Sequence, residues 1–574
     1  MTILETLDGE LEKIFNKLNY DNSFARFQYS DRPDLSDFQT NCAMPMCKIL
    51  HKSPREIADV IVIELEKSGL FENITVDGPG FVNVKIKNDV LLDIINDTMD
   101  DEKCGYLHGE ESKTVVIDFG GYNIAKEPHV GHLRSTVIGE SIRRIYKFCG
   151  DKVISDVHQG DWGLPMGMVI EGIRLKYSNA KCFREDFNDN KIDDLQLTAQ
   201  ELTEIYRASS AKAKEDKEFD NKIHETTTKL QNGYEPYIVL WKYFAKISID
   251  DLKEISEDIF GAHFDYWNGE SCVHELIKIM LRNLIQRGIV IGSRGAKIID
   301  ISDKDGEIPP VIVENSTGAI MYATSDIATI LDRIQKFNCD LMLYVVDGRQ
   351  SLHLRQVFLA CEKIGLLNER HRAEHCSFGT MNGKDNKPFK TRSGENVKLR
   401  DLINDVIEKI SEKSDGSSKD TIKNIAVACI KFMDLMNYRE SNYIFDTEQF
   451  TNYEGKTGAY ILYSVVRIKS ILSSQEKFTY KIVELRTKEE KGLLLELSKF
   501  SDVVRSSYGK KAPNFIAEYV YTLAKKFSSF YANCNINNES DIGYKKSKIS
   551  LIYLVKQYIE VCIDLLGMRA VDSM

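Results

Sequence analysis

The most revealing part of this chain of 574 residues runs Val115-Val-Ile-Asp-Phe-Gly-Gly-Tyr-Asn-Ile-Ala-Lys-Glu-Pro-His-Val-Gly-His-Leu-Arg-Ser-Thr136. An apolar β-branched run predicts a buried strand, and the Gly-rich polar residues after it predict a turn. Beyond the turn, apolar residues recur at helical spacing, which predicts a helix to about Phe148 that stops at Gly150. A strand, turn and helix in this order direct backbone N–H groups and the positive helix end at a bound phosphate. The stretch therefore predicts a nucleotide site on a parallel sheet.

Two histidines, His129 and His132, flank Gly131 at the start of this predicted helix. A neutral imidazole donates to phosphate oxygens without adding a permanent charge, and glycine lets a base or ribose approach the backbone. We interpret the three residues as the candidate catalytic element. Four-residue patterns recur by chance, and a histidine beside a helix start also serves as a cap, so the interpretation depends on its context.

That context resembles the class I aminoacyl-tRNA synthetases, and Asn123-Ile-Ala-Lys-Glu-Pro-His-Val-Gly-His-Leu-Arg-Ser-Thr136 is similar specifically to the arginyl-tRNA synthetases. Further similar segments follow in order: Gly160-Asp-Trp-Gly163, Tyr322-Ala-Thr-Ser-Asp326, Phe389-Lys-Thr-Arg-Ser-Gly394 and Leu565-Leu-Gly-Met568. The resemblance implies that L-arginine is joined to its tRNA through an arginyl-adenylate, with ATP as a reactant accompanied by Mg2+ and with no structural metal. A non-catalytic RNA-binding paralogue and a small nucleotidyltransferase are the competing interpretations.

Composition limits the class of protein without deciding it. A chain of this length with 43% hydrophobic residues is predicted to fold into several domains with sizeable cores. The net charge of −11 does not exclude a tRNA partner, because binding needs only a local basic groove. The twelve cysteines include no Cys-x-x-Cys, which suggests neither zinc nor disulfides. Without a signal peptide or an apolar membrane-spanning run, we predict a cytoplasmic protein that contacts no membrane and is a monomer.

The pattern along the chain predicts an α/β protein of three domains. Residues 111–402 alternate strands and helices, as a Rossmann-type doubly wound parallel sheet does, with strands at 115–119, 153–156 and 341–346. A connective insertion is expected at about 177–315. Residues 1–110 form an N-terminal α/β module with a helix at 54–67 and a strand at 80–87, and residues 403–574 form an all-helical domain. The resemblance implies that the module binds the tRNA elbow and that the helical domain binds the anticodon.

The arginine pocket is expected at the carboxyl ends of the strands. Selecting arginine requires a carboxylate for the planar guanidinium, for which Asp326 is the natural partner. Tyr322, four residues earlier, would share a helical face with Asp326. The resemblance adds four more residues to the pocket: Asp118 as a carboxylate at the strand end, and Asn123, His129 and Gln350. In isolation, Asp326 could instead cap a helix and Gln350 could be an ordinary loop residue.

Cations for ATP are expected in two places. The resemblance assigns Lys126, His129, His132 and Lys390 to ATP. The usual second signature, Lys-Met-Ser-Lys-Ser, is replaced by a segment that lacks its second lysine, Gly383-Lys-Asp-Asn-Lys-Pro-Phe-Lys-Thr-Arg-Ser-Gly394. In the family, the lysine before the His-x-Gly-His element is thought to compensate, which is what Lys126 would do. Lys390 and Arg392 would then be the cations of a mobile loop that closes over pyrophosphate.

Four residues are candidates for tRNA contact. Phe38, if exposed, suits stacking on an unpaired base, with Gln39 beside it. The alternative is that Phe38 belongs to the core and Gln39 caps a turn. In the helical domain, Tyr460 and Arg467 supply an aromatic and a cationic side chain suited to anticodon bases.

Overall fold

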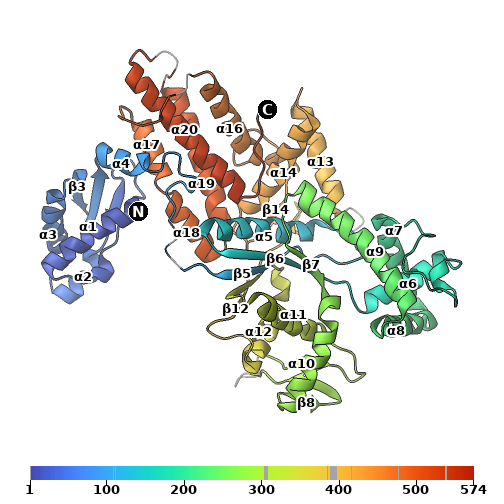
Figure 1. Ribbon diagram of the computed structural model, residues 1–574. Coiled ribbons are helices and arrows are strands. Elements are labelled where there is room, and N and C mark those ends of the chain that lie inside the picture. The colour runs from blue at the N-terminus through green and yellow to red at the C-terminus, as the bar shows by residue number, and fades with distance from the viewer. Residues whose placement is uncertain are drawn as a thin grey trace. The chain divides into compact units, whose positions relative to one another are not determined.

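The computed structural model describes residues 2–107, 109, 111–302, 308–383, 386–387, 397–414, 416–475, 478–534, 536 and 539–574 (Figure 1). The chain divides into two compact units, which we describe separately. The first unit comprises Met1–Glu110, Tyr453–Leu565 and Arg569–Met574, and the second comprises Glu111–Asn452 and Leu566–Met568. No helix in the described ranges is long and apolar enough to cross a membrane.

The second unit is built on a five-stranded parallel sheet with strand order β12-β11-β5-β6-β7. The chain runs outward from β5 to β6 and β7, then returns to the other side of β5 to form β11 and β12. This reversal between β5 and β11 is the switch point where ligands bind in doubly wound sheets. The predicted sheet is confirmed, and its strands are Thr114–Asp118 (β5), Lys152–Gln159 (β6), Tyr266–Gly269 (β7), Leu341–Tyr344 (β11) and Arg372–His375 (β12).

The strands around the switch point end in register. Asp118 at the end of β5 pairs with Asp156 of β6 and with Tyr344 of β11. Before these ends the strands are mainly apolar, because parallel strands are normally buried on both faces of the sheet. The sheet therefore brings its polar side chains together at one edge.

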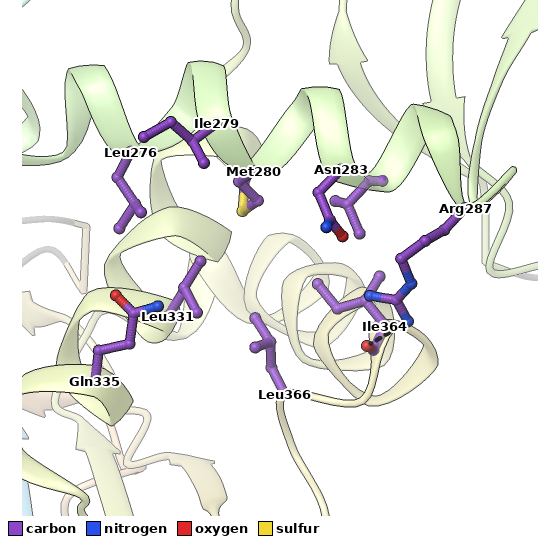
Figure 2. A pocket seen from close by; sticks show the side chains of 10 residues that line it. Leu276, Ile279, Met280, Asn283, Arg287, Leu331, Gln335, Ile364 and Leu366 are labelled. Atoms are coloured by element: carbon purple, nitrogen blue, oxygen red, sulfur yellow. Dashed lines mark hydrogen bonds between the residues drawn. The ribbon is translucent and has the colours of Figure 1, made fainter.

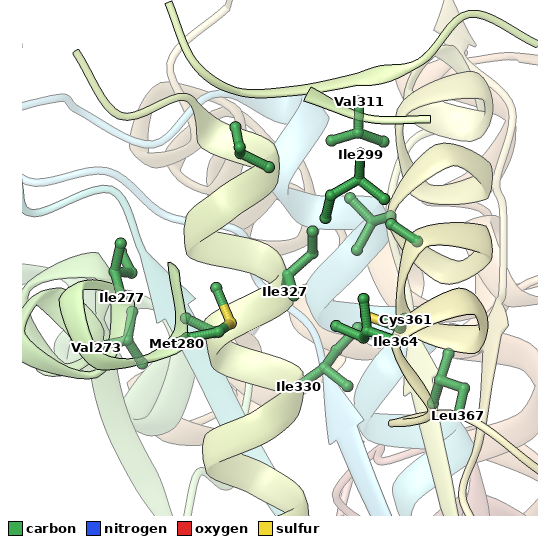
Figure 3. Packing of buried hydrophobic residues seen from close by; sticks show 14 of the residues in the cluster. Val273, Ile277, Met280, Ile299, Val311, Ile327, Ile330, Cys361, Ile364 and Leu367 are labelled. Carbon is green, nitrogen blue, oxygen red and sulfur yellow. The ribbon is translucent and has the colours of Figure 1, made fainter. Parts of the chain in front are cut away.

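Helices cover the sheet, and apolar side chains of these helices and of the strands form a buried core between them. Figure 3 shows Ile327 and Ile330 of α11 beside Cys361 and Ile364 of α12, and all four belong to one buried apolar cluster. The start of α5 lies at the end of the turn after β5, as predicted. The helices next to the central strands along the chain are Val130–Cys149 (α5, after β5), Leu164–Lys176 (α6, after β6), Tyr322–Phe337 (α11, before β11) and Ser351–Ile364 (α12, after β11).

The expected insertion at 177–315 is interrupted, because β7 joins the central sheet beside β6. The sequence did not indicate this strand, since Tyr266-Trp-Asn-Gly269 is short and has no apolar alternation. The first part of the insertion is helical and packs on α6, and the second adds a helix and a three-stranded antiparallel sheet. The elements are Ala199–Glu215 (α7), Lys217–Gln231 (α8), Glu235–Lys253 (α9), His274–Gln286 (α10), Val290–Ser293 (β8), Ala296–Ile299 (β9) and Val311–Glu314 (β10).

The second unit also contains the first helices beyond residue 402. These helices belong to the same compact unit as the central sheet, and this unit extends to Asn452. Two short parallel strands accompany these helices. The elements are Met381–Asn382 (β13), Leu399–Lys413 (α13), Lys419–Leu435 (α14), Tyr443–Ile444 (β14) and Thr447–Phe450 (α15).

The first unit combines an antiparallel sheet of order β1-β2-β4-β3 with the C-terminal helices. The predicted helix at 54–67 is confirmed. It begins at Pro54 because Ser53 and Glu56 form a capping box and proline suits the first turn of a helix. The N-terminal elements are Ile3–Leu18 (α1), Gln28–Tyr29 (β1), Phe38–Thr40 (β2), Ala43–Leu50 (α2), Pro54–Lys67 (α3), Phe71–Asp77 (β3), Phe81–Ile86 (β4) and Asn88–Asn96 (α4). The C-terminal helices are Gly458–Ser473 (α16), Lys488–Leu497 (α17), Phe500–Lys510 (α18), Asn514–Asn533 (α19) and Ile542–Leu565 (α20).

Candidate active site

Two imidazoles cap the N-terminus of α5. His129 is the N-cap residue, and its Nδ1 accepts a hydrogen bond from the backbone N–H of Gly131 at 3.0 Å. His132 reaches back, and its Nδ1 accepts from the backbone N–H of His129 at 3.1 Å. The arrangement is a capping box in which histidines replace the usual Ser or Thr and Glu. The two ring centroids lie 4.1 Å apart.

These hydrogen bonds fix the protonation of both rings. Because each Nδ1 is an acceptor, the proton of each neutral imidazole lies on Nε2. Burial, together with His129 and Lys126 nearby, lowers the pKa of His132 to about 3. Burial, with Arg349 and Lys126 nearby, also lowers the pKa of His129. The site therefore holds two neutral imidazoles that each keep an Nε2–H donor for an anion.

Gly131 makes room for the ring of His129. A Cβ atom at this position would lie 2.8 Å from Cε1 and 2.9 Å from Nδ1 of His129. Any side chain would therefore displace the capping imidazole. The sequence indicated a different role for Gly131, which was to let a base or ribose approach the backbone.

Lys126 lies in the turn between β5 and α5. The preceding residue, Ala125, has a left-handed backbone with φ of 57°, and Ser248 Oγ accepts its N–H at 3.1 Å. The Lys126 Nζ atom lies 4.8 Å from the ring centroid of Tyr206 on α7. Lys126 also contributes to the low pKa of both imidazoles, so its ammonium shares their surroundings.

The same turn lies beside the chain that leaves the expected mobile loop. Glu127 pairs with Lys398 at 2.8 Å, and the N–H of Leu399 donates to the carbonyl of Pro128 at 2.9 Å. Lys390 and Arg392, the predicted loop cations, lie outside the described residues. The chain directly after them, from Val397, is adjacent to the start of α5, because the N–H of Val130 donates to the Val397 carbonyl.

The switch point is fastened by Ser135. Its hydroxyl accepts from the N–H of Gly120 at 2.8 Å and donates to the carbonyl of Val345 at 2.7 Å, which ties the end of β5 to the end of β11. Asn123 lies beside Gly160, the residue that follows β6. A Cβ atom on Gly160 would lie 2.4 Å from Asn123 Oδ1, so this glycine permits the close approach.

Asp118 is paired inside the protein. Its Oδ2 accepts from Arg333 Nη2 at 2.7 Å, and Arg333 also binds Asp156 at 2.9 Å. All three side chains are buried. A ligand at the end of β5 therefore meets an aspartate already engaged by an arginine of the chain itself.

A cluster of acidic and polar side chains, the proposed acidic pocket, lies where α11 and α12 begin. Tyr322 and Asp326 are one turn apart on α11, as predicted, and Tyr322 is 65% exposed. His353 Nε2 lies 2.6 Å from Asp326 Oδ2, and this bond raises the pKa of His353. Gln350 stands one turn before His353, at the start of α12. The two helices thus bring three of the predicted pocket residues together.

Glu270 completes this pocket and was missed by the sequence reasoning. It directly follows β7, and burial, with the charges of Asp161 and Asp326 nearby, raises its pKa to about 8. Burial and Glu270 likewise raise the pKa of Tyr322. Within the described part of the chain, no lysine or arginine forms an ion pair with Glu270 or Asp326. Protonation of Glu270 avoids charge repulsion with Asp326, and a bound hydrogen-bonding cation would stabilise the carboxylate form of Glu270 instead.

The candidate tRNA-contact residues differ in their surroundings. Phe38 is completely buried in β2, so the expectation of an exposed stacking ring is wrong, and the alternative that it belongs to the core is confirmed. Gln39 is half-buried in the same strand. Tyr460 and Arg467 both approach α19: the Tyr460 hydroxyl lies 3.1 Å from Ser528 Oγ, and the Arg467 guanidinium lies 4.2 Å from the ring centroid of Tyr531.

A partly apolar cavity lies away from these residues. A cavity of about 280 Å3 lies between α10, α11 and the end of α12, lined by Met280, Leu331 and Ile364 among others (Figure 2). None of the predicted site residues lines it. Over the described residues, no group of three or more His, Cys, Asp or Glu side chains is placed to hold a metal ion.

Models of protein families match almost the whole chain. Residues 1–86 match "Arginyl tRNA synthetase N terminal domain", residues 95–447 match "tRNA synthetases class I (R), catalytic domain", and residues 461–574 match "DALR anticodon binding domain". The catalytic match covers the strands, helices and turn that form the site described above.

Two curated proteins that are similar over the whole chain are both arginine–tRNA ligases. The arginine–tRNA ligase of Francisella tularensis subsp. tularensis (strain FSC 198) is 40% identical over 585 residues, and that of Alkaliphilus oremlandii is 39% identical, each covering 100% of both chains. Among solved structures, the arginyl-tRNA synthetase from Plasmodium falciparum is similar with a TM-score of 0.80 and 25% identity, covering 100% of this chain and 99% of that one. The Thermus thermophilus arginyl-tRNA synthetase, at 19% identity and a TM-score of 0.77 over both full chains, shares the fold.

Proposed function

The chain belongs to the arginyl-tRNA synthetase family and attaches arginine to tRNA, and we propose that it does so through an arginyl-adenylate formed at the carboxyl end of its parallel sheet. The arginine carboxylate attacks the α-phosphate of ATP in line and displaces pyrophosphate. A terminal ribose hydroxyl of tRNA then attacks the arginyl carbonyl of the adenylate, and AMP leaves. The protein has to align two anions and spread the charge that builds on the phosphates.

His129 and His132 bind the triphosphate and ribose in this proposal. Their Nε2–H groups are free to donate because both Nδ1 atoms are used in the helix cap. Neutral donors held in place before ATP arrives cost no reorganisation during the reaction. Lys126 adds a cation beside them, and Lys390 and Arg392 are proposed to close over pyrophosphate. Mg2+ is proposed to accompany ATP, where it would partly neutralise the charge of the phosphates.

The acidic pocket is the observation that carries the specificity for arginine. Asp326 and Glu270 have no ion pair with a lysine or arginine in the described ranges, and a planar guanidinium supplies a charge with five donors. Tyr322 stands on the same helical face as Asp326, where its ring or hydroxyl is available to the guanidinium. Asp118, Asn123, His129 and Gln350 are proposed to surround the rest of the amino acid.

The remaining parts are proposed to bind tRNA. The N-terminal module, residues 1–110, would contact the tRNA elbow. Gln39 remains a candidate for this contact, whereas Phe38 is buried. The helical domain, residues 403–574, would bind the anticodon, with Tyr460 and Arg467 of α16 as candidates. Residence in the cytoplasm and a monomeric state are part of the same proposal.

A comparison of arginine with citrulline tests the proposed pocket. Citrulline has nearly the same shape, but a neutral ureido group replaces the guanidinium. We expect arginine to bind at least about 30-fold more tightly in isothermal titration calorimetry, since a desolvated charge pair is worth roughly 2–5 kcal/mol. Lysine, which keeps the charge without the planar fork, separates the contribution of charge from that of shape. Equal affinity for arginine and citrulline would overturn the assignment of the acidic pocket.

A further inference from the structure

The turn that carries Lys126 is held by two residues of the connective insertion. One is Ser248 on α9, which contacts the backbone before the lysine, and the other is Tyr206 on α7, which contacts the ammonium. Both belong to helices far along the chain from the turn, so no sequence pattern indicates that they meet it.

Ser248 fixes a strained backbone. Ala125 is 1% exposed and has a φ of 57°, a conformation that residues other than glycine adopt rarely and keep only when their surroundings enforce it. The Ser248 hydroxyl accepts from the Ala125 N–H at 3.1 Å and donates to the Phe244 carbonyl at 3.0 Å. Ser248 is itself 5% exposed, so this bond is shielded from water. The direction in which the chain enters Lys126 is therefore set by α9.

Tyr206 holds the side chain without neutralising it. Its ring packs against the apolar core of the insertion and presents a face to Lys126 Nζ at 4.8 Å. Among the residues that the structure describes, no carboxylate forms an ion pair with Lys126. A carboxylate at this place would hold the lysine but cancel the charge that phosphates need, whereas an aromatic face attracts the ammonium and leaves its charge available.

We propose that Tyr206 and Ser248 are positioning residues for arginine activation, which hold the Lys126 ammonium beside His129 and His132 where the triphosphate of ATP is received. The inference rests on the proposed role of Lys126. It gives the connective insertion a part in catalysis: α7 and α9 supply the support for a lysine that replaces the missing lysine of the second signature.

A double-mutant cycle tests the inference. Arginine activation is measured as ATP–pyrophosphate exchange with tRNA present, for the parent, Lys126→Ala, Tyr206→Leu, Tyr206→Phe, Ser248→Ala, and Lys126→Ala combined with Tyr206→Leu or with Ser248→Ala. Lys126→Ala should lower kcat by about two orders of magnitude, the scale of one preorganised donor. Tyr206→Leu should lower kcat on the order of threefold to thirtyfold with little change in the KM for arginine, and Tyr206→Phe, which keeps the ring face, should restore it. Ser248→Ala should act in the same direction.

The combined variants decide between positioning and general support of the fold. If Tyr206 and Ser248 act through Lys126, neither substitution lowers kcat further once the lysine is gone. Tyr234→Leu is the matched control, because Tyr234 is an exposed tyrosine of the same insertion whose ring makes an edge-to-face contact with Tyr237. Thermal unfolding of each variant checks its folding, and Ser248→Ala keeps the test valid if Tyr206→Leu does not fold.

The possible failures are distinguishable. Losses that add in the combined variants would overturn the inference, since they indicate a role independent of Lys126. Silent Tyr206→Leu and Ser248→Ala variants beside a damaged Lys126→Ala enzyme would overturn it while leaving the proposed role of Lys126 intact. A fully active Lys126→Ala enzyme would refute the proposed role of Lys126 and the inference with it.

Discussion

Asp326 is the residue from which the strongest effect on arginine is expected. In Asp326→Asn, one charged partner of the guanidinium becomes neutral, and the KM for arginine should rise about 30-fold or more, corresponding to roughly 2–5 kcal/mol. The KM for ATP should stay close to that of the parent, because the imidazoles and Lys126 are untouched. Steady-state aminoacylation measures both constants. Asp332→Asn is the matched control, because Asp332 lies on the same helix but pairs with Lys336 at 2.8 Å.

A KM for arginine within about threefold of the parent, under roughly 1 kcal/mol, would remove Asp326 from the pocket. An equal effect of the Asp332 control would point to helix α11 as a whole instead of to the carboxylate. The Asp326 variant also loses part of its bond to His353, so a thermal unfolding curve accompanies the kinetics.

Glu270 predicts how arginine binding depends on pH. Its pKa is raised to about 8 from an ordinary value of 4.5, so below pH 8 the free protein keeps this carboxyl protonated. A bound guanidinium favours the charged carboxylate, which means that arginine binding releases a proton and tightens as the pH rises. Between pH 6.5 and 8, the Kd should fall by up to about tenfold per pH unit. Titration calorimetry in two buffers of different ionisation enthalpy measures the released proton directly. Glu270→Gln should flatten the profile, and a pH-independent Kd in the parent would contradict the account.

At the scale of elements, the N-terminus of α5 joins helix stability to phosphate binding. His132→Ala removes both the acceptor for the His129 N–H and the Nε2–H donor, so it should cost about 0.5–2 kcal/mol of stability as well as activity. His132→Gln separates the two effects, because glutamine at this helix position reaches back to the N-cap as in an ordinary capping box. We expect the glutamine variant to unfold at nearly the parent denaturant concentration and still to form adenylate slowly in a single turnover. Parent-like adenylate formation by His132→Gln would show that the imidazole is not needed at the phosphates.

The elements that the sequence predicted well carry their own local signals. Helix α3 begins at Pro54 after a Ser53 cap, and β5 is a continuous β-branched run, so both were located from a few residues. Strand β7 has no such signal, and only its pairing with β6 reveals it. A capping role for a histidine at the start of α5 was named only as the alternative to phosphate contact, and the structure shows that both imidazoles cap the helix.

The site depended on information of another kind. Asp326, Tyr322 and Gln350 were found through resemblance to a family, and a periodic pattern alone would have left them as a helix cap and loop residues. Phe38 was placed wrongly because alternation along a strand separates two faces without saying which one is buried. Glu270, Ser248 and Tyr206 gave no sign in the sequence, since each gains its meaning from a contact with a distant segment.

At the scale of the whole molecule, the doubly wound sheet is what brings the distant residues together. Asp118 and Arg333 are 215 positions apart in the chain and 2.7 Å apart in the structure, because β5 and the helix before β11 meet at the switch point. The same topology gathers the helix cap, the Lys126 turn and the acidic pocket at one edge. The modules at both ends of the sequence match tRNA-synthetase domains, so the whole chain, and not the sheet alone, fits a tRNA ligase.

Aminoacylation of total tRNA, measured separately with each of the twenty amino acids in the presence of ATP, tests the central claim most directly. The account predicts that arginine alone is attached to tRNA, with release of pyrophosphate, and that lysine is not attached even though it carries the same charge. Charging with a different amino acid, or tRNA binding without any charging, would contradict it.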